Sequence, residues 1–263
     1  MRRLCNIDKR EVKGKLMPRT QQPHRKYIDN LCDPASYFCT LVYSLKCHKL
    51  ACAVLGEDTA EVEEYIKEYS SAACEYMDEE KRMWRQWEEP ERCYLPVAQG
   101  LAYLAGLCTE AEYKSAIVKM KDLPTTAYPD AGLSKYWLLK GMFASGAIQM
   151  GLETVRKMWG ALLDKGETTC SERWDHEYMG DIQEDISLSA CHGWSAGAAP
   201  LLIEYILGVQ AVEPGYRKIK IQPKLFDLDF VEGEVPTVHG IVYVKATKDG
   251  IEYRLPEGVE LVK

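Results

Sequence analysis

The amino-acid sequence predicts a mainly α protein with a small β domain at its C-terminus: part of an α/α toroid followed by an antiparallel β-sandwich. From about residue 34 to residue 207, apolar helices alternate with amphipathic ones. Inner helices buried on all sides and wrapped by amphipathic outer helices are the arrangement of a toroid. After Gly208 the hydrophobic period changes to two, which is typical of half-buried strands. We therefore expect a helical domain over residues 1–208 and a β domain over residues 209–263.

The composition is that of an ordinary soluble globular protein. The 263 residues are 46% hydrophobic and 28% charged, which is enough apolar material for a sizeable core. The net charge of −7 disfavours nucleic acid or an anionic membrane as a partner. We find no run of about 18 apolar residues and no secretory signal pattern, so neither a membrane helix nor a signal peptide is expected.

The ten cysteines form no CxxC pair, and several of them lie inside apolar helical stretches. A free thiol in such a stretch behaves as a small hydrophobic residue. The spacing of zinc ligands is absent, and a disulfide scaffold is unusual in a chain of this length. The sequence thus predicts a reduced, cytoplasmic protein with no metal and no cofactor.

Local start and stop signals place seven helices. Asp33 and Pro34 combine a capping acceptor with a first-turn proline, while Thr109 and Glu112 have the spacing of a capping box. Gly56 is placed to end the first helix. The predicted helices cover residues 34–55, 59–77, 96–107, 110–121, 134–146, 149–164 and 192–207.

The remaining segments are predicted to be loops and strands. Residues 1–32 are typical of extended or irregular chain, and residues 122–133 are rich in turn formers. Residues 78–94 are charged and contain Trp84 and Trp87, which we expect to be packing residues rather than platforms for a sugar. Alternating residues predict strands at 218–222, 240–245 and 250–255, with an Asp-Gly hairpin turn at residues 248–250.

One acidic stretch, residues 168–196, combines residue types that act on sugars. It contains Glu172, Trp174, His192 and Trp194, which are one carboxylate, one imidazole and two indoles. Carboxylates carry out acid–base chemistry on glycosides, and aromatic faces stack on sugar rings. A surface loop with two core tryptophans has the same composition, so the residues alone leave that alternative open. In a toroid, loops that precede inner helices gather at one rim, where a site is expected.

Four segments of the chain resemble one enzyme family, in its order and spacing. Residues 168–175 (TTCSERWD) are similar to a TTxWExWD segment, and residues 191–196 (CHGWSA) are similar to a CHxWSA segment. Residues 158–166 resemble the preceding outer helix, and residues 204–223 resemble the junction into a C-terminal sandwich. These segments are those of the α-L-rhamnosidases, glycoside hydrolase family 78. The resemblance is specific from about residue 133 to residue 245 and weaker before that.

The resemblance implies a six-hairpin glycosidase fold, which is an (α/α)6 barrel with a C-terminal β-sandwich. It also implies inverting hydrolysis of terminal α-L-rhamnosides, in which one carboxylate takes a proton from water and a carboxylic acid protonates the leaving oxygen. Glu172 falls at the family's general-base position, and His192 falls at a histidine that contacts the sugar. Trp174 and Trp194 would line the same region, although ordinary core tryptophans remain an equal interpretation.

Two departures from the family pattern qualify this expectation. Ser171 stands where the family has an aromatic residue, and seven helices are predicted where the barrel has twelve. The family's general-acid glutamate lies in an upstream segment that this chain does not resemble, so the chain alone is expected to be a weak or inactive enzyme. The other acidic residues of the stretch are interpreted as a solvated loop: Asp175, Glu177, Asp181, Glu184 and Asp185.

Two functional hypotheses therefore stay open. The first is a rhamnosidase-like glycoside hydrolase that receives its acid from elsewhere, for example from a complementing N-terminal half. The second is a non-catalytic, truncated remnant that binds sugar or a partner. A toroid lyase would need a Tyr or His pair for proton abstraction, and none is apparent. Because part of a ring leaves helices with two apolar faces to cover, the sequence also predicts a homo-oligomer or a smaller closed bundle.

Overall fold

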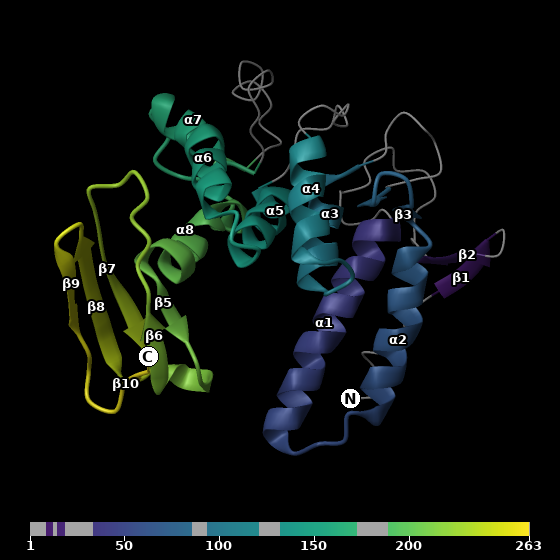
Figure 1. Ribbon diagram of the computed structural model, residues 1–263, viewed down its shortest axis with the longest axis horizontal. Coiled ribbons are helices and arrows are strands. Elements are labelled where there is room, and N and C mark those ends of the chain that lie inside the picture. Colours follow the sequence, from purple (N-terminus) through teal and green to yellow (C-terminus); the bar gives the residue numbers. More distant parts are fainter. Residues whose placement is uncertain are drawn as a thin grey trace. The chain divides into compact units, whose positions relative to one another are not determined.

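The computed structural model describes residues 9–12, 15–18, 34–85, 94–120, 132–172 and 189–262. It contains helices and mostly antiparallel sheets, as the predicted mainly α fold with a β domain requires (Figure 1). The chain divides into two compact units. Unit 1 comprises residues 1–145 and 173–183, and unit 2 comprises residues 146–172 and 184–263. The predicted boundary between residues 208 and 209 separates a helical domain from a β domain, which is not the division into these two units. That boundary stays a prediction.

Unit 1 is built from five helices and two short hairpins among its described residues. The helices are α1 (Pro34–Leu55), α2 (Ala60–Cys74), α3 (Pro96–Leu104), α4 (Glu110–Lys119) and α5 (Gly132–Ala144). The hairpins pair β1 (Lys9–Val12) with β2 (Lys15–Pro18), and β3 (Met77–Asp78) with β4 (Met83–Trp84). The expected helix starts are confirmed at Pro34 and at Thr109, where both hydrogen bonds of the capping box are present. The prediction that Met77 continues the second helix is wrong, because α2 ends at Cys74.

Aromatic side chains fill the core between α1, α2 and α3. The ring of Phe38 stacks on Tyr69 and on Tyr76, each at a centroid distance of 6.1 Å. Trp84 is 2% exposed, and its indole N–H donates to the main-chain oxygen of Ala73 at 3.2 Å. Trp84 is thus a packing residue, as predicted, whereas Trp87 lies outside the described residues.

Helices α3 and α5 approach each other closely because small residues line their contact. A Cβ atom on Gly100 of α3 would lie 2.4 Å from the carbonyl oxygen of Trp137 in α5. One on Gly141 of α5 would lie 3.2 Å from Cα of Gly100 and 2.6 Å from the hydroxyl of Tyr113 in α4. The Tyr113 hydroxyl in turn donates to the carbonyl of Leu138 at 3.0 Å. The space that the two glycines leave open therefore sets the distance between these helices.

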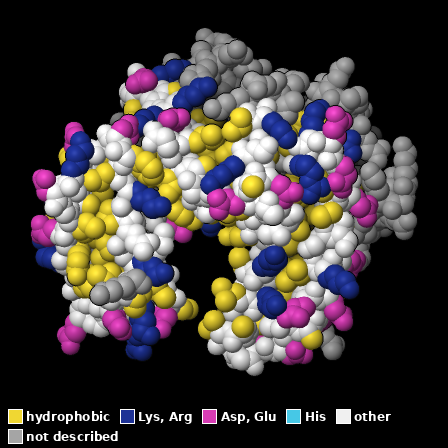
Figure 2. Space-filling view, in the orientation of Figure 1, with side chains coloured by type: hydrophobic (Ala, Val, Ile, Leu, Met, Phe, Trp, Pro, Cys, Tyr) yellow, Lys and Arg dark blue, Asp and Glu magenta, His cyan; other side chains and the backbone are white. Residues whose placement is uncertain are grey.

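Helix α1 is long and apolar enough to cross a membrane by length and composition alone, whereas no such stretch was expected. One such helix is weak support for a membrane span. Ala35, Phe38 and Val42 are fully buried in the core of unit 1, so the first half of α1 is a core helix. Its C-terminal end exposes hydrophobic side chains, as Figure 2 shows: Leu50, Val54 and Leu55.

In unit 2 the helices are shorter than predicted. Helix α6 (Ile148–Met158) stops at Trp159, and α7 (Gly160–Asp164) follows it, where one helix over residues 149–164 was expected. The predicted helix over residues 192–207 is three pieces: the 3-10 turn η2 (Gly193–Ala196), α8 (Ala198–Leu202) and the π-helical turn η3 (Ile203–Leu207). Gly193, Gly197 and Pro200 explain the interruption, since all three disfavour a regular helix.

Two three-stranded sheets complete unit 2. One has the order β10–β6–β5, from β10 (Glu260–Leu261), β6 (Lys218–Ile221) and β5 (Val209–Ala211). The other has the order β7–β8–β9, from β7 (Phe230–Thr237), β8 (Gly240–Thr247) and β9 (Gly250–Arg254). The short 3-10 turn η4 (Pro214–Tyr216) precedes β6. The predicted strands near residues 218, 240 and 250 are present, whereas β5, β7 and β10 were not predicted.

The two sheets and η3 share one hydrophobic cluster. Val209 and Ile219 belong to one sheet, Val242 and Val244 to the other, and all four are at most 1% exposed. Gly208 joins η3 to β5 with φ +77°, and a Cβ atom there would lie 2.2 Å from the main chain of Gln222. A glycine is therefore required where the helical part of unit 2 meets its sheets.

Candidate active site

Two segments of unit 2 that are distant in sequence lie side by side and bring the predicted site residues together. Their main chains are joined twice: the N–H of Glu172 donates to the carbonyl of Ser189, and the N–H of His192 donates to the carbonyl of Cys170, both at 2.8 Å. The Thr169 hydroxyl adds a bond of 2.7 Å to the carbonyl of Ala190. Residues 169–172 are thus fixed against residues 189–192.

This pairing places the Glu172 carboxylate beside the His192 imidazole, although the two residues are 20 apart in sequence. The distance from Glu172 Oε2 to His192 Nδ1 is 3.7 Å, which is an ion-pair contact when the imidazole is protonated and too long for a hydrogen bond. The side chain of Glu172 is 21% exposed and that of His192 is 29% exposed. Both groups are therefore held in place while they remain accessible to a solute.

The carboxylate of Glu172 also has a main-chain donor. The N–H of Ser189 points at Oε2 from 3.4 Å, and the Ser195 hydroxyl contacts the Glu172 carbonyl at the same distance. An N–H donor restricts the orientation of the carboxylate that it contacts. The local structure therefore orients Glu172 from two sides.

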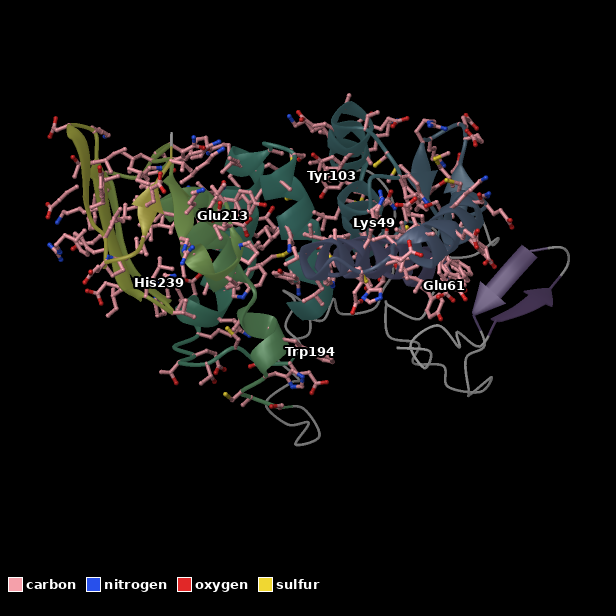
Figure 3. The ribbon with its side chains drawn as sticks, turned by 90° about the horizontal axis from the view of Figure 1, so that it is seen from below. Lys49, Glu61, Tyr103, Trp194, Glu213 and His239 are labelled. Carbon is pink, nitrogen blue, oxygen red and sulfur yellow. The ribbon has the colours of Figure 1, made fainter. Side chains whose placement is uncertain are left out.

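Trp194 flanks the imidazole. Its ring centroid lies 4.3 Å from that of His192, and the planes are inclined by 42°. Trp194 projects from η2 with 39% of its surface exposed (Figure 3). A partly exposed indole can pack against an apolar ring surface of a ligand.

Ser195 and Trp159 hold the segment that carries His192 and Trp194 through buried hydrogen bonds. Neither residue was predicted as a site residue. Ser195 is fully buried, its N–H donates to the carbonyl of His192 at 3.0 Å, and its own carbonyl accepts the indole N–H of Trp159 at 2.8 Å. Ser195 and Trp159 lie within the segments that resemble the family, residues 191–196 and 158–166, and this position was the one sign in the sequence of their role. Ser189 had no signal, because its role depends on its main chain.

Two cysteines border the same segments. Cys170 is half-buried and Cys191 is exposed. Burial, and to a smaller extent the nearby Cys191 thiol, raise the pKa of Cys170. Cys170 is therefore a thiol rather than a thiolate at neutral pH.

The structure brings together three of the four predicted site residues: Glu172, His192 and Trp194. The fourth, Trp174, lies outside the described residues, and so does the acidic loop with Asp175, Glu177, Asp181, Glu184 and Asp185. Within the described ranges, no group of three or more His, Cys, Asp or Glu side chains is placed to hold a metal ion. The described part of the site thus consists of one oriented carboxylate, one imidazole and one indole.

Comparison with known proteins gives one matching family and several similar structures. Residues 208–260 match the bacterial alpha-L-rhamnosidase C-terminal domain. A search of curated protein sequences gives no match. The structure resembles the family 78 rhamnosidase of Bacillus sp. GL1 with a TM-score of 0.66 and 23% identity, over 88% of this chain and 27% of that one.

Two further crystal structures are similar. An α-L-rhamnosidase of Streptomyces avermitilis, in complex with L-rhamnose, has a TM-score of 0.67 and 18% identity over 86% of this chain and 23% of its own. An α-L-rhamnosidase of Aspergillus terreus has a TM-score of 0.69 and 19% identity over 90% of this chain and 29% of its own.

The chain spans less than a third of the length of these proteins. Most of the chain follows their fold, and the C-terminal match covers β5 to β10. The resemblance that the motifs predicted is therefore confirmed: residues 208–260 match the bacterial α-L-rhamnosidase C-terminal domain, and the fold of the chain is similar to part of the α-L-rhamnosidase structures.

Proposed function

We propose that the chain is part of a rhamnosidase-like glycoside hydrolase, and that Glu172 is the general base in the inverting hydrolysis of terminal α-L-rhamnosides. The observation that carries this proposal is the placement of the Glu172 carboxylate 3.7 Å from His192, with the Trp194 ring in tilted contact with the imidazole. The family match and the similar rhamnosidases support the substrate class. The fold that we propose with it is a partial (α/α)6 toroid followed by a β-sandwich.

The geometry suits a general base. The carboxylate must be ionised, fixed in direction and reachable by water, and Glu172 combines a main-chain donor with 21% exposure. In an inverting reaction the base takes a proton from the water that attacks the anomeric carbon, and an acid on the other face of the sugar protonates the leaving oxygen. The accessible side chain of His192 and the exposed part of the Trp194 ring would contact the sugar ring beside that water.

The acid is proposed to come from outside the stretch that matches the family motifs. Inverting enzymes hold their two carboxyl groups about 6.5–9.5 Å apart, and Glu172 is the carboxylate that we assign to the pair. A missing acid lowers the rate by about 10²–10⁴-fold. The loss is smallest for substrates whose leaving group needs no proton.

The test uses an aryl α-L-rhamnoside with a nitrophenolate leaving group, which departs without an acid. We expect slow turnover by the wild-type chain, complete loss in Glu172→Gln, and no change in Glu153→Gln, a matched carboxylate on the exposed side of α6. Proton NMR of the first product should show the β-anomer. Turnover that is the same in Glu172→Gln as in the wild-type chain would contradict the role of this residue.

A second candidate function is sugar binding without catalysis. The observation in its favour is the partly exposed indole of Trp194 beside His192, which can contact a sugar ring without any chemical step. Titration calorimetry with L-rhamnose distinguishes the two, with Trp194→Ala as the variant that removes the ring surface. Binding that depends on Trp194, together with no turnover of the aryl substrate, would favour the binding protein over the enzyme.

A further inference from the structure

Strand β9 is an open edge of the sheet β7–β8–β9. Among the described strands it pairs with β8 alone, and all five of its residues are exposed. Figure 1 shows it at the outer side of the sheet. An edge strand presents unpaired main-chain N–H and C=O groups, so it is a template for the addition of another strand.

The opposite edge, β7, is blocked by a proline. Thr237 pairs with Gly240 across a two-residue turn, and Val235 pairs with Val242 two positions further along. Because main-chain groups alternate in direction along a strand, those of Pro236 face away from β8. Proline has no N–H to donate at this outward position. Strand β9 contains no proline, so of the two described edges of this sheet it is β9 that offers a complete set of donors and acceptors.

The turn between β8 and β9 determines which groups of β9 face outward. Thr247 and Gly250 are paired across two turn residues, and the pair that closes such a turn exchanges both hydrogen bonds. Along β9, even-numbered residues therefore direct their main-chain groups to β8. The odd-numbered residues Ile251 and Tyr253 direct theirs to the free edge, and Leu255, which directly follows β9, continues the alternation.

The same strand leaves part of the core-facing side of the sheet uncovered. Ile251 lies opposite Ala246, and Tyr253 lies opposite Val244. Ala246 and Val244 are 1% and 0% exposed, whereas Ile251 and Tyr253 are 53% and 45% exposed. Figure 2 shows hydrophobic side chains gathered over the region of these strands. Two large apolar side chains thus point to the core side of the sheet without being covered.

The other side of β9 carries one acid and one base, two positions apart. Glu252 and Arg254 contact each other at 3.4 Å, and their side chains are 63% and 65% exposed. Arg254 also lies over the Tyr243 ring at 3.8 Å, which directs it along the surface of the sheet. Both charges remain available to a strand that is added at this edge.

We propose that β9 pairs with β9 of a second copy of this chain, antiparallel and centred on Tyr253. In this register Glu252 lies opposite the partner's Arg254, and Arg254 lies opposite the partner's Glu252. Ile251 lies opposite the partner's Leu255 on the core side, and Tyr253 meets the partner's Tyr253. A two-fold axis passes between the two Tyr253 residues, so that contact occurs once, whereas the contacts of Glu252 with Arg254 and of Ile251 with Leu255 each occur twice.

Charge selects this register over its neighbours. Because the main-chain groups of every second residue face outward, the alternative registers of the two β9 strands differ from this one by steps of two residues. A pairing centred on Glu252 places two carboxylates opposite each other, and a pairing centred on Arg254 does the same with two guanidinium groups. Like charges that are directly opposite in a sheet are unfavourable. Pro256 ends the strand beyond Leu255, which keeps the contact short and the association weak.

The test is a charge exchange, measured by sedimentation velocity on the full chain. We expect the wild-type chain to dimerise at about 10–100 µM. Glu252→Arg and Arg254→Glu should each weaken the dimer by about 10- to 100-fold, because each places like charges opposite one another twice. The double variant should restore it. A mixture of the two single variants should form a heterodimer, in which all charges are again opposite.

Circular dichroism and urea unfolding of each variant show whether the monomer still folds. A wild-type chain that remains a monomer at these concentrations would overturn the proposal. So would a dimer that is indifferent to both single exchanges, since that dimer would use another surface, such as the exposed end of α1. Loss of association in the double variant as well would rule out the register centred on Tyr253.

Discussion

The indole N–H of Trp159 donates a hydrogen bond of 2.8 Å to the main-chain oxygen of Ser195, 36 residues further along the chain. Trp159 stands at the break between α6 and α7, and Ser195 lies in the turn that carries His192 and Trp194. One buried bond therefore connects the helical part of unit 2 with the segment that carries the imidazole. The proposed site depends on this support, although both groups are buried.

Replacement of Trp159 should destabilise unit 2. Trp159→Phe removes the bond to Ser195 and leaves its buried carbonyl without this donor, which costs about 1–3 kcal/mol. Urea unfolding followed by circular dichroism measures the change. Trp194→Phe is the matched control: Trp194 is 39% exposed, so a loss within about 0.5 kcal/mol is expected. Equal losses in the two variants would contradict the structural role of Trp159.

The junction at Gly208 should tolerate no side chain. Gly208→Ala places a methyl group 2.2 Å from the Gln222 carbonyl at a backbone φ of +77°, and we expect a loss of about 2–4 kcal/mol of unfolding free energy. Gly160→Ala is the control, because nothing lies within 4 Å of a Cβ atom there. That variant should be neutral or slightly more stable. Thermal unfolding of both proteins makes the comparison.

The capping box of α4 predicts a pH dependence. Hydrogen bonds from the Thr109 main chain, and next from Arg82, lower the pKa of Glu112 from 4.5 to about 2. Since the folded pKa is depressed, the stabilisation is complete above pH 4.5 and is lost as the pH falls toward 2. Glu112→Gln should therefore be less stable than the wild-type chain at pH 7, and the difference should shrink by about half between pH 6 and pH 3.

Urea unfolding at several pH values tests this expectation. Glu110→Gln is the control, because it removes a carboxylate from the same helical turn and leaves the capping box intact. The stability difference for Glu110→Gln should change much less over the same range. A difference for Glu112→Gln that stays constant from pH 6 to pH 3 would contradict the lowered pKa.

The thiols should react at very different rates. Burial raises the pKa of Cys108 to about 12, so only about one molecule in 10,000 carries the thiolate at pH 8. Cys191 is exposed. Iodoacetamide should modify Cys191 well before Cys108 in the folded protein, as peptide mass spectrometry will show. In concentrated urea the two rates should converge, and a fast reaction at Cys108 in the folded state would contradict its burial.

Local signals in the sequence were sufficient for most helix starts. Pro34 fixes a first turn through its own ring, and Thr109 satisfies a free N–H of α4, so neither depends on distant residues. The break between α6 and α7 at Trp159 was missed. It is accompanied by a hydrogen bond from the Trp159 indole to Ser195, and a long-range bond of this kind leaves no periodic pattern in the sequence. Strand β7 was missed because Gly233 and Pro236 interrupt its alternation, although its pairing with β8 is regular.

The site was predictable in composition but not in geometry. Glu172 and His192 were identified by their motifs, yet nothing in their spacing shows that they meet. Their contact arises from main-chain pairing between Cys170 and His192 and between Glu172 and Ser189. Backbone hydrogen bonds leave little trace in side-chain identity. Trp174 and the acidic loop after it stay predictions.

That pairing has a consequence for variation within the site. The bonds that hold Glu172 opposite His192 use peptide groups, which every residue except proline supplies. Ser171, which replaces the aromatic residue of the family, can therefore differ without moving the carboxylate. Substitutions at the other positions of these two segments should therefore leave the distance between Glu172 and His192 unchanged, as long as the main-chain bonds between the segments are kept.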